Sequence, residues 1–267
     1  MIKHQIKGSA SQMIVCQLDE AQMMYCEAGK FLWKTANVSI ETRFTTPETE
    51  EANKEKSGFQ KFVGGAKEVA KRGLAGESIA FQYFTPEGGS GIVAFAGNLP
   101  GEIREIPLDG TKTWFAEKDA FMAAEKGVNF DIQWAGWKVG RKGGEGFILE
   151  KFHGEGSLFI SGAGNFIDIN PSKYGGKIQV DNGCLVAFEE GITYNVDRIG
   201  KFDAAGVKTA FFGGEGMSLA TFEGDGQVIL QSVSMVALAR TLYHAGQQAS
   251  TEGTAGSIRG LLGGSTD

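Results

Sequence analysis

The sequence predicts an all-β chain that is built from three similar units and ends in a short helix. Two compositional facts and one pattern support this prediction. Glycine accounts for 40 of the 267 residues, while proline accounts for only 5. Glycine at that level between short apolar runs, with no Gly-X-Y period, is typical of many tight turns that connect short strands. The pattern is a glycine-rich segment that occurs three times in the chain.

The repeated segment reads AGESIAFQYFTPEGGSGIVAFAG at 75–97, GGEGFILEKFHGEGSLFISG at 143–162 and GGEGMSLATFEGDGQVILQS at 213–232. In each copy a glutamate stands seven residues before a phenylalanine; the pairs are Glu77 with Phe84, Glu145 with Phe152, and Glu215 with Phe222. Such regular recurrence indicates an internal triplication. Alternating apolar positions before the second glycine group predict a strand, and the apolar run after it predicts a return strand. Each copy is therefore expected to form a β-hairpin.

A second segment also recurs, and it resolves a local ambiguity. FAEKDAFMAAEKG at 115–127 is rich in Ala, Glu and Lys and by itself favours a helix. Its counterpart VDNGCLVAFEEG at 180–191 has Asn-Gly between apolar runs, which is a strong hairpin signal. Because copies of one unit should share a fold, both are expected to be strand–turn–strand. A weaker copy opens at Leu18, and this alignment places Glu27 with Glu125 and Glu189.

These landmarks divide the chain into consecutive units. The predicted boundaries are 1–97, 98–162 and 163–232 for the three β-repeats, followed by a C-terminal helix and flexible tail at 233–267. The spacing between the two landmarks is longest in the first repeat, which indicates an insertion at about 46–73. The charged first half of that insertion is expected to face solvent.

The predicted C-terminal helix lies in SMVALARTLYHAG at 234–246. Its apolar side chains fall on one face at helical spacing; they are Met235, Leu238, Ala239 and Leu242. Gly246 provides a stop signal. This face is expected to cover an exposed sheet edge.

The charge balance and the cysteines narrow the class of protein. The formal charge is −6 and the isoelectric point is about 5.3, so nucleic acid is an unfavourable partner. The three cysteines, Cys16, Cys26 and Cys184, are odd in number and form no CxxC pair, which disfavours a disulfide framework or a zinc site. The first residues lack the apolar stretch of a signal peptide, and no window resembles a membrane helix. The expected compartment is the cytoplasm.

No pattern in the sequence predicts catalysis. The histidines His4, His153 and His244 stand alone, without the spacing of a metal site. The sequence has no Gly-x-Ser-x-Gly elbow, and the YGGK stretch at 174–177 lacks the Ser or Thr of a phosphate loop. We therefore expect no catalytic residues, no metal site and no cofactor, and we do not expect an enzyme.

Two groups of side chains have both a structural and a functional interpretation. Glu77, Glu145 and Glu215 either form a carboxylate ring that binds a cation or amine, or accept backbone N–H bonds within their own glycine-rich turns. The second interpretation is favoured, because repetition retains structural features more readily than sites. The tryptophans either pack in a core or interface, which is commoner, or line an aromatic pocket; they are Trp33, Trp114, Trp134 and Trp137.

Four segments together resemble one known family. They are GNLPGEI at 97–103, GGEGFILEKFHGEGSLF, VDNGCLVAF and GDGQVILQS. In this order they resemble the family of the mitochondrial biogenesis protein "altered inheritance of mitochondria 24", from about Ile2 to Leu242. The resemblance implies three double-stranded β-helix or β-sandwich units like those of the tryptophan RNA-binding attenuation protein, assembled as a homotrimer, and it carries over no catalytic residues. Mitochondrial members are associated with inner-membrane organisation, which leaves peripheral membrane association open, although no motif here indicates it.

The expected function is that of a non-enzymatic β-rich assembly or scaffold protein that forms a homotrimer and has an unidentified protein or small-molecule partner. The alternative is a protein that binds a small ligand, or less plausibly RNA, in pockets between repeats or subunits. For the homotrimer, the apolar strands MIVCQL and QVILQS are expected to be exposed edges that pair across subunits.

Overall fold

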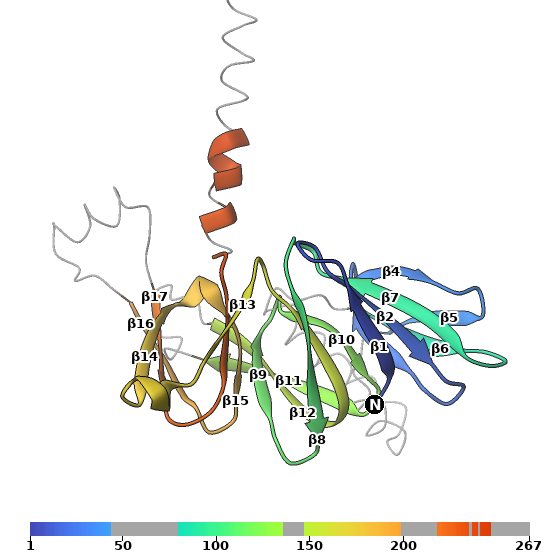
Figure 1. Ribbon diagram of the computed structural model, residues 1–267, viewed down its shortest axis with the longest axis horizontal. Helices are drawn as coiled ribbons and strands as arrows, with labels where there is room; N and C mark the ends of the chain where they lie inside the picture. Colours follow the sequence, from blue (N-terminus) through green and yellow to red (C-terminus); the bar gives the residue numbers. More distant parts are fainter. Residues whose placement is uncertain (44–79, 136–146, 199–217, 235–236, 240, 247–267) are drawn as a thin grey trace, which may run out of the picture.

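The computed structural model describes residues 1–43, 80–135, 147–198, 218–234, 237–239 and 241–246. Within them the chain is mostly β-sheet, and its strands form three units that lie side by side in chain order (Figure 1). The first unit is blue to cyan in the figure, the second green to yellow-green, and the third yellow to orange. The predicted all-β class with a short C-terminal helix is confirmed.

The first unit is organised around two central strands, β6 and β7. β6 lies between β3 and β5, while β7 lies between β2 and β4, and β1 is added outside β2. β1, β2, β7 and β4 form a four-stranded sheet, while β3, β6 and β5 are the end of a larger sheet that continues into the next unit. The apolar core of this unit includes Ile14, Val93 and Phe84. The strands of this unit are β1 (Lys3–Lys7), β2 (Met13–Leu18), β3 (Met24–Glu27), β4 (Phe31–Lys34), β5 (Val38–Arg43), β6 (Phe81–Pro86) and β7 (Gly91–Ala96).

The second unit has one long central strand, β12, in place of two. The first half of β12 lies between β9 and β11, and its second half lies between β8 and β10. The strand changes partners at Gly154 and Gly156, which both have positive φ, at 102° and 136°. The strands are β8 (Ile103–Asp109), β9 (Trp114–Glu117), β10 (Phe121–Glu125), β11 (Val128–Ala135) and β12 (Phe147–Ser161).

The third unit again uses two central strands, β17 and β18. β17 lies between β14 and β16, and β18 lies between β13 and β15. Short 3₁₀ turns precede β14 and β15, at Pro171–Tyr174 and Asn182–Cys184. The strands are β13 (Phe166–Ile169), β14 (Lys177–Asp181), β15 (Leu185–Glu189), β16 (Thr193–Arg198), β17 (Ser218–Glu223) and β18 (Val228–Gln231).

The repeated phenylalanines occupy the same kind of position. Phe84, Phe152 and Phe222 are all fully buried. Each sits on a central strand directly opposite an apolar residue of a flanking strand; the pairs are Phe84 with Ile40, Phe152 with Phe130, and Phe222 with Tyr194.

The hairpin predictions are wrong, although strands and turns lie where they were expected. β6 and β7 belong to different sheets, as do β17 and β18, so these segments are arches that connect two layers. β14 and β15 also do not pair, despite the Asn-Gly turn between them. The physical reason is that every central strand already has a partner on both edges, so its hydrogen-bonding groups are satisfied without its sequence neighbour.

The prediction for 115–127 is confirmed, because this segment forms β9, a turn and β10 rather than a helix. Both strands have ladder partners on either side, and Ala116, Phe121 and Ala124 are buried in the core. Ladder bonds and burial outweigh the helix propensity of Ala, Glu and Lys.

Strands at the unit boundaries join the three units into a continuous body. β3 of the first unit pairs with β10 of the second, and β9 of the second unit pairs with β15 of the third. The two edge strands predicted from sequence are therefore not edges. β2 is paired on both sides by β1 and β7, and β18 is paired by β13 and β15.

The C-terminal segment is helical at 237–239 and 241–246, and it projects away from the β-body (Figure 1). Leu242 is 63% exposed, so the predicted apolar face does not cover a sheet edge of its own chain. Met235 lies outside the described residues. No helix in the described part of the chain is long and apolar enough to cross a membrane. The insertion at 46–73 also lies outside the described residues.

Candidate functional site

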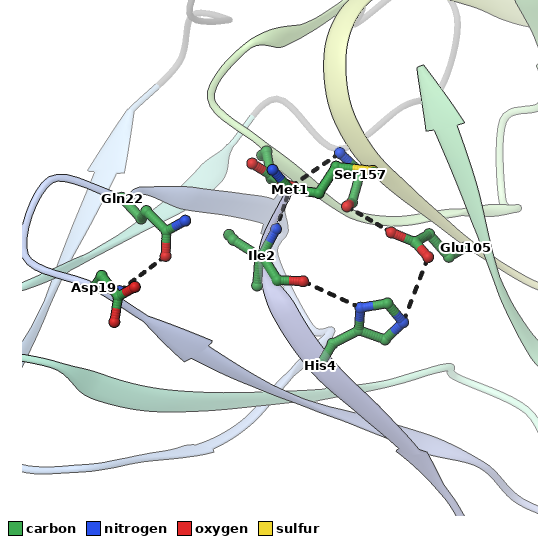
Figure 2. A network of polar contacts seen from close by, with 8 residues as sticks. Met1, Ile2, His4, Asp19, Gln22, Glu105 and Ser157 are labelled. Atoms are coloured by element: carbon green, nitrogen blue, oxygen red, sulfur yellow. Dashed lines mark hydrogen bonds and ion pairs between the residues drawn. The ribbon is translucent and has the colours of Figure 1, made fainter. Parts of the chain in front are cut away.

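A polar network joins the first unit to the second (Figure 2). Glu105 on β8 accepts a hydrogen bond from the Ser157 hydroxyl at 2.6 Å, and its other oxygen lies 3.6 Å from Nε2 of His4. The His4 ring also packs edge-on against Phe159, with 4.9 Å between centroids. Serine, histidine and a carboxylate are the components of a nucleophilic triad, so their order matters.

The order of these contacts does not suit nucleophilic catalysis. In a triad the histidine lies between serine and carboxylate, whereas here Glu105 lies between Ser157 and His4. Ser157 is also fully buried, so its hydroxyl cannot meet a substrate from solvent. The contacts instead fix β1 against β8 and β12.

Glu125 forms the second half of this network. Its Oε1 accepts hydrogen bonds from the backbone N–H of Ile2 at 2.7 Å and of Ser157 at 3.1 Å. Glu189 does the same in the third unit, where it accepts from the N–H of Gln227 at 2.8 Å. Glu125 thus holds the start of the second half of β12, and Glu189 holds the start of β18.

The counterpart of these glutamates in the first unit is Thr35, not Glu27 as the sequence alignment predicted. The Thr35 hydroxyl accepts from the N–H of Ile92 at 3.0 Å, at the start of β7. The three strands leading to these residues share a register shift, located between Phe31 and Trp33, between Phe121 and Ala123, and between Leu185 and Ala187. Glu27 lies one strand earlier, at the end of β3. It was aligned with Glu125 and Glu189 because all three precede a glycine by two positions.

The repeated glutamates Glu77, Glu145 and Glu215 lie outside the described residues, so both interpretations of them stay predictions. The turn carboxylates that the structure does describe bond to backbone N–H groups. Glu117 accepts from the N–H of Asp119, and Asp181 accepts from that of Gly183, each at 2.9 Å.

The cysteines have the environment of inert thiols. Cys16 and Cys26 are buried, Cys184 is half-buried, and all three are free. Burial, with smaller effects from nearby carboxylates, raises the pKa of Cys16 to about 12 and raises the pKa of Cys26 further. Burial and Asp181 also raise the pKa of Cys184. A catalytic thiol requires the opposite shift.

The histidines are dispersed in the structure. His4 lies on β1 and His153 on β12, while His244 is exposed in the C-terminal helix. Among the described residues, no group of three or more His, Cys, Asp or Glu side chains is arranged to hold a metal ion.

The tryptophans divide between burial and exposure. Trp114 is 6% exposed in the core, whereas Trp33 on β4 is 41% exposed. The side chain of Trp134 and the whole of Trp137 lie outside the described residues, so the predicted aromatic pocket has no test here.

A cleft of about 280 Å³ lies where the three units meet. It is lined by the β3–β4 turn, the β9–β10 turn, the two segments that link the units, and β15 with β18. The residues are Lys30, Asn98, Leu99, Glu117, Asp119, Ala120, Ser161, Gly162, Ala163, Leu185, Val186 and Gln231. Sequence reasoning expected pockets between repeats but named none of these residues.

Lys30 is the unusual member of this lining, because only 4% of it is exposed. Its backbone is used in the β3–β4 turn, where it bonds to Glu27 and Ala96. Within the described residues, the Lys30 ammonium has no assigned ion-pair or hydrogen-bond partner. At the same turn position the second and third units have the small residues Ala120 and Cys184. A sequence alignment that matched these three turns would have shown a lysine in place of a small residue.

Comparison with known proteins identifies the family. The sequence profile described as mitochondrial biogenesis AIM24 matches residues 4–233, so the chain belongs to that family, as its segments predicted. It is 26% identical over 232 residues to an uncharacterised protein of Streptococcus pyogenes serotype M6, covering 86% of this chain and 85% of that protein. A crystal structure of a Streptococcus pyogenes protein is similar in fold, with a TM-score of 0.69 and 22% identity over 92% of this chain and 100% of that one.

Proposed function

We propose that this member of the AIM24 family is a non-enzymatic assembly protein, whose chains join edge to edge into a homotrimer. Each chain supplies three copies of one β-unit of the kind that the resemblance implies. The observation that carries the proposal is the way in which successive units already pair within one chain.

Three recurrent features support a common unit. The pairing order of the strands is the same in each, since two flanking strands enclose each central strand or half-strand. A register shift occurs at the same point, before Trp33, Ala123 and Ala187. A side-chain oxygen then accepts the same backbone N–H, in the pairs Thr35 with Ile92, Glu125 with Ser157, and Glu189 with Gln227.

The four flanking strands of each unit, in chain order, are β2 to β5 in the first unit, β8 to β11 in the second, and β13 to β16 in the third. At each unit boundary, the third flanking strand of one unit pairs with the second flanking strand of the unit before it. β10 pairs with β3 through Ala123↔Cys26 and Ala124↔Tyr25. β15 pairs with β9 through Ala187↔Ala116 and Phe188↔Phe115. The corresponding strands left over at the two ends of the array are β4 and β14. Within the described chain each of them has a ladder partner on one side only.

The burial of β4 supports a missing neighbour. Met122 and Val186, at the register shift, are fully or almost fully buried, but their counterpart Leu32 is 49% exposed. Ala123 and Ala187 are fully buried, but their counterpart Trp33 is 41% exposed. On the other end, Gln179 of β14 is exposed, and nearby Tyr174 is 65% exposed. Two large apolar side chains on a free edge favour a partner strand.

The partner that fits β4 is β14 of a second copy. Repeating the register of the two internal boundaries places Trp33 opposite Val180, Lys34 opposite Gln179, and Thr35 opposite Ile178. Such a head-to-tail contact is heterologous, so it closes into a ring when the rotation permits. The family resemblance favours three copies.

Cross-linking tests the contact at the level of register. In a Cys184→Ser background, Lys34→Cys with Gln179→Cys should form intermolecular disulfides on mild oxidation, because facing residues place their Cβ atoms about 4.5–5.5 Å apart. The matched control pairs Lys34→Cys with Ile167→Cys, on β13, another strand of the third unit with one ladder partner among the described residues. Light scattering should give three times the 28.5 kDa chain mass. A stable monomer, or equal cross-linking of both pairs, would refute the proposed interface.

The cytoplasm is the proposed compartment, and the free state of all three cysteines supports it, since thiols persist in reducing surroundings. The scaffold role is tested by purification of the tagged native protein with quantitative mass spectrometry. Stoichiometric recovery of a specific protein with the wild type, but not with a Trp33→Lys variant, is the expected result. Recovery of no protein beyond the chain itself would contradict it.

A further inference from the structure

The cleft between the units has the features of a binding site rather than of a packing defect. Its volume of about 280 Å³ equals roughly nine water molecules at about 30 Å³ each, which suits a small organic molecule. Apolar side chains make up part of the wall, and Ala120, Ala163 and Leu185 among them are buried.

Lys30 brings a positive charge to this cleft, at the end of a side chain that is almost wholly buried. A lysine is almost never buried to this extent unless its ammonium is paired. The described protein residues provide no such partner. The charge of Lys30 also acts on the nearby Cys26 thiol: burial raises the pKa of that thiol, and Lys30 lowers it. A lysine that lines a cleft, has a buried stem and has no ion-pair partner among the described residues is suited to bind a ligand of opposite charge.

The other polar groups of the cleft restrict the ligand further. Gln231 is held in place by two bonds, because its amide oxygen accepts from Ala163 N–H and its nitrogen donates to the Gly183 carbonyl. Asn98 and Ser161 can donate to an anion beside Lys30. Glu117 and Asp119 are also in the lining. Asp119 is 67% exposed and pairs with Lys118, and Glu117 accepts from the Asp119 N–H, so both charges are partly offset, but they still oppose a dianion such as phosphate more than a monoanion.

We propose that this cleft binds a small organic monocarboxylate, with the carboxylate against Lys30 and a short apolar body against the alanine and leucine wall. The singly charged group makes a charge-assisted contact with the Lys30 ammonium, and the apolar body displaces water from the apolar wall.

The test uses the full-length protein and three chemically matched probes. 4-Methylpentanoate has the proposed charge and body, 4-methylpentanamide has the same body without charge, and inorganic phosphate has charge without a body. Binding is measured by ligand-observed NMR and calorimetry. We expect the carboxylate to bind, and the amide to bind at least about tenfold more weakly, because a charge-assisted contact is lost.

Variants then assign the charge to Lys30. Lys30→Met keeps the length of the side chain and should lower carboxylate affinity at least about tenfold, whereas Lys30→Arg should keep it within a few-fold. Lys7→Met, on exposed β1, is the matched control and should leave affinity unchanged. The proposal is overturned if the carboxylate fails to bind the wild type, if amide or phosphate binds as well as it does, or if folded Lys30→Met binds it normally.

Discussion

Replacing Glu125 with alanine tests whether one carboxylate holds the start of the second half of β12. Its Oε1 accepts the backbone N–H groups of Ile2 and Ser157, and its side chain is only 15% exposed. Ser157 is fully buried and Ile2 is 4% exposed, so water replaces the lost acceptor poorly. A buried donor without an acceptor costs about 1–3 kcal/mol, so the two together should destabilise the chain by about 3 kcal/mol.

Thermal and urea denaturation measure this effect. At about 2 °C per kcal/mol for a chain of this size, Glu125→Ala should lower Tm by about 6 °C. Glu125→Gln keeps an acceptor oxygen and should cost less than half as much. Glu189→Ala, which frees the single backbone N–H of Gln227, should fall between Glu125→Ala and the control.

Glu20→Ala is the matched control, because Glu20 is exposed, and it should change stability by less than about 0.5 kcal/mol. If Glu125→Ala were no more destabilising than Glu20→Ala, the carboxylate would not be fixing the strand. Equal effects of Glu125→Ala and Glu125→Gln would show that charge, rather than an acceptor atom, is what matters.

Three further predictions follow from backbone geometry, burial and the repeat. Gly154→Ala should destabilise the chain by at least about 2 kcal/mol more than Gly175→Ala in urea titrations. Both residues have positive φ, but only at Gly154 would a Cβ lie 2.2 Å from a backbone oxygen, that of Gly127. Equal effects would mean that the contact relaxes freely. Burial raises the pKa of Cys16 from 9.0 to about 12, so the folded thiol stays protonated at pH values where the unfolded one ionises. Its contribution to stability should therefore be present below pH 9 and be lost as pH rises from about 9 to 12. Cys16→Ala should flatten that decline in alkaline urea titrations, and an unchanged slope would contradict the assignment. Deleting about residues 48–70 should leave a cooperatively melting protein, since a doubling of loop length changes closure entropy by only about 0.6 kcal/mol; insoluble protein after deletion would assign the segment to the core or to an interface.

Much of the fold was determined by local sequence. The period-two pattern and the glycine groups placed the strands and turns, and the phenylalanines that the recurring segments share, Phe84, Phe152 and Phe222, are all fully buried. Comparison between copies also overruled the helix propensity of 115–127. These properties follow from side-chain alternation and turn chemistry, which act between residues close in the chain.

Strand partners were decided only by the tertiary structure. Alternation shows which face of a strand is buried but not which strand lies beside it, so arches were mistaken for hairpins and the inner strands β2 and β18 for edges. The boundary pairing of Tyr25 with Ala124 joins residues about a hundred positions apart, and no local pattern encodes it. Lys30 shows the same limit: its turn is readable in the sequence, but its burial in a cleft arises only when three distant units pack around it.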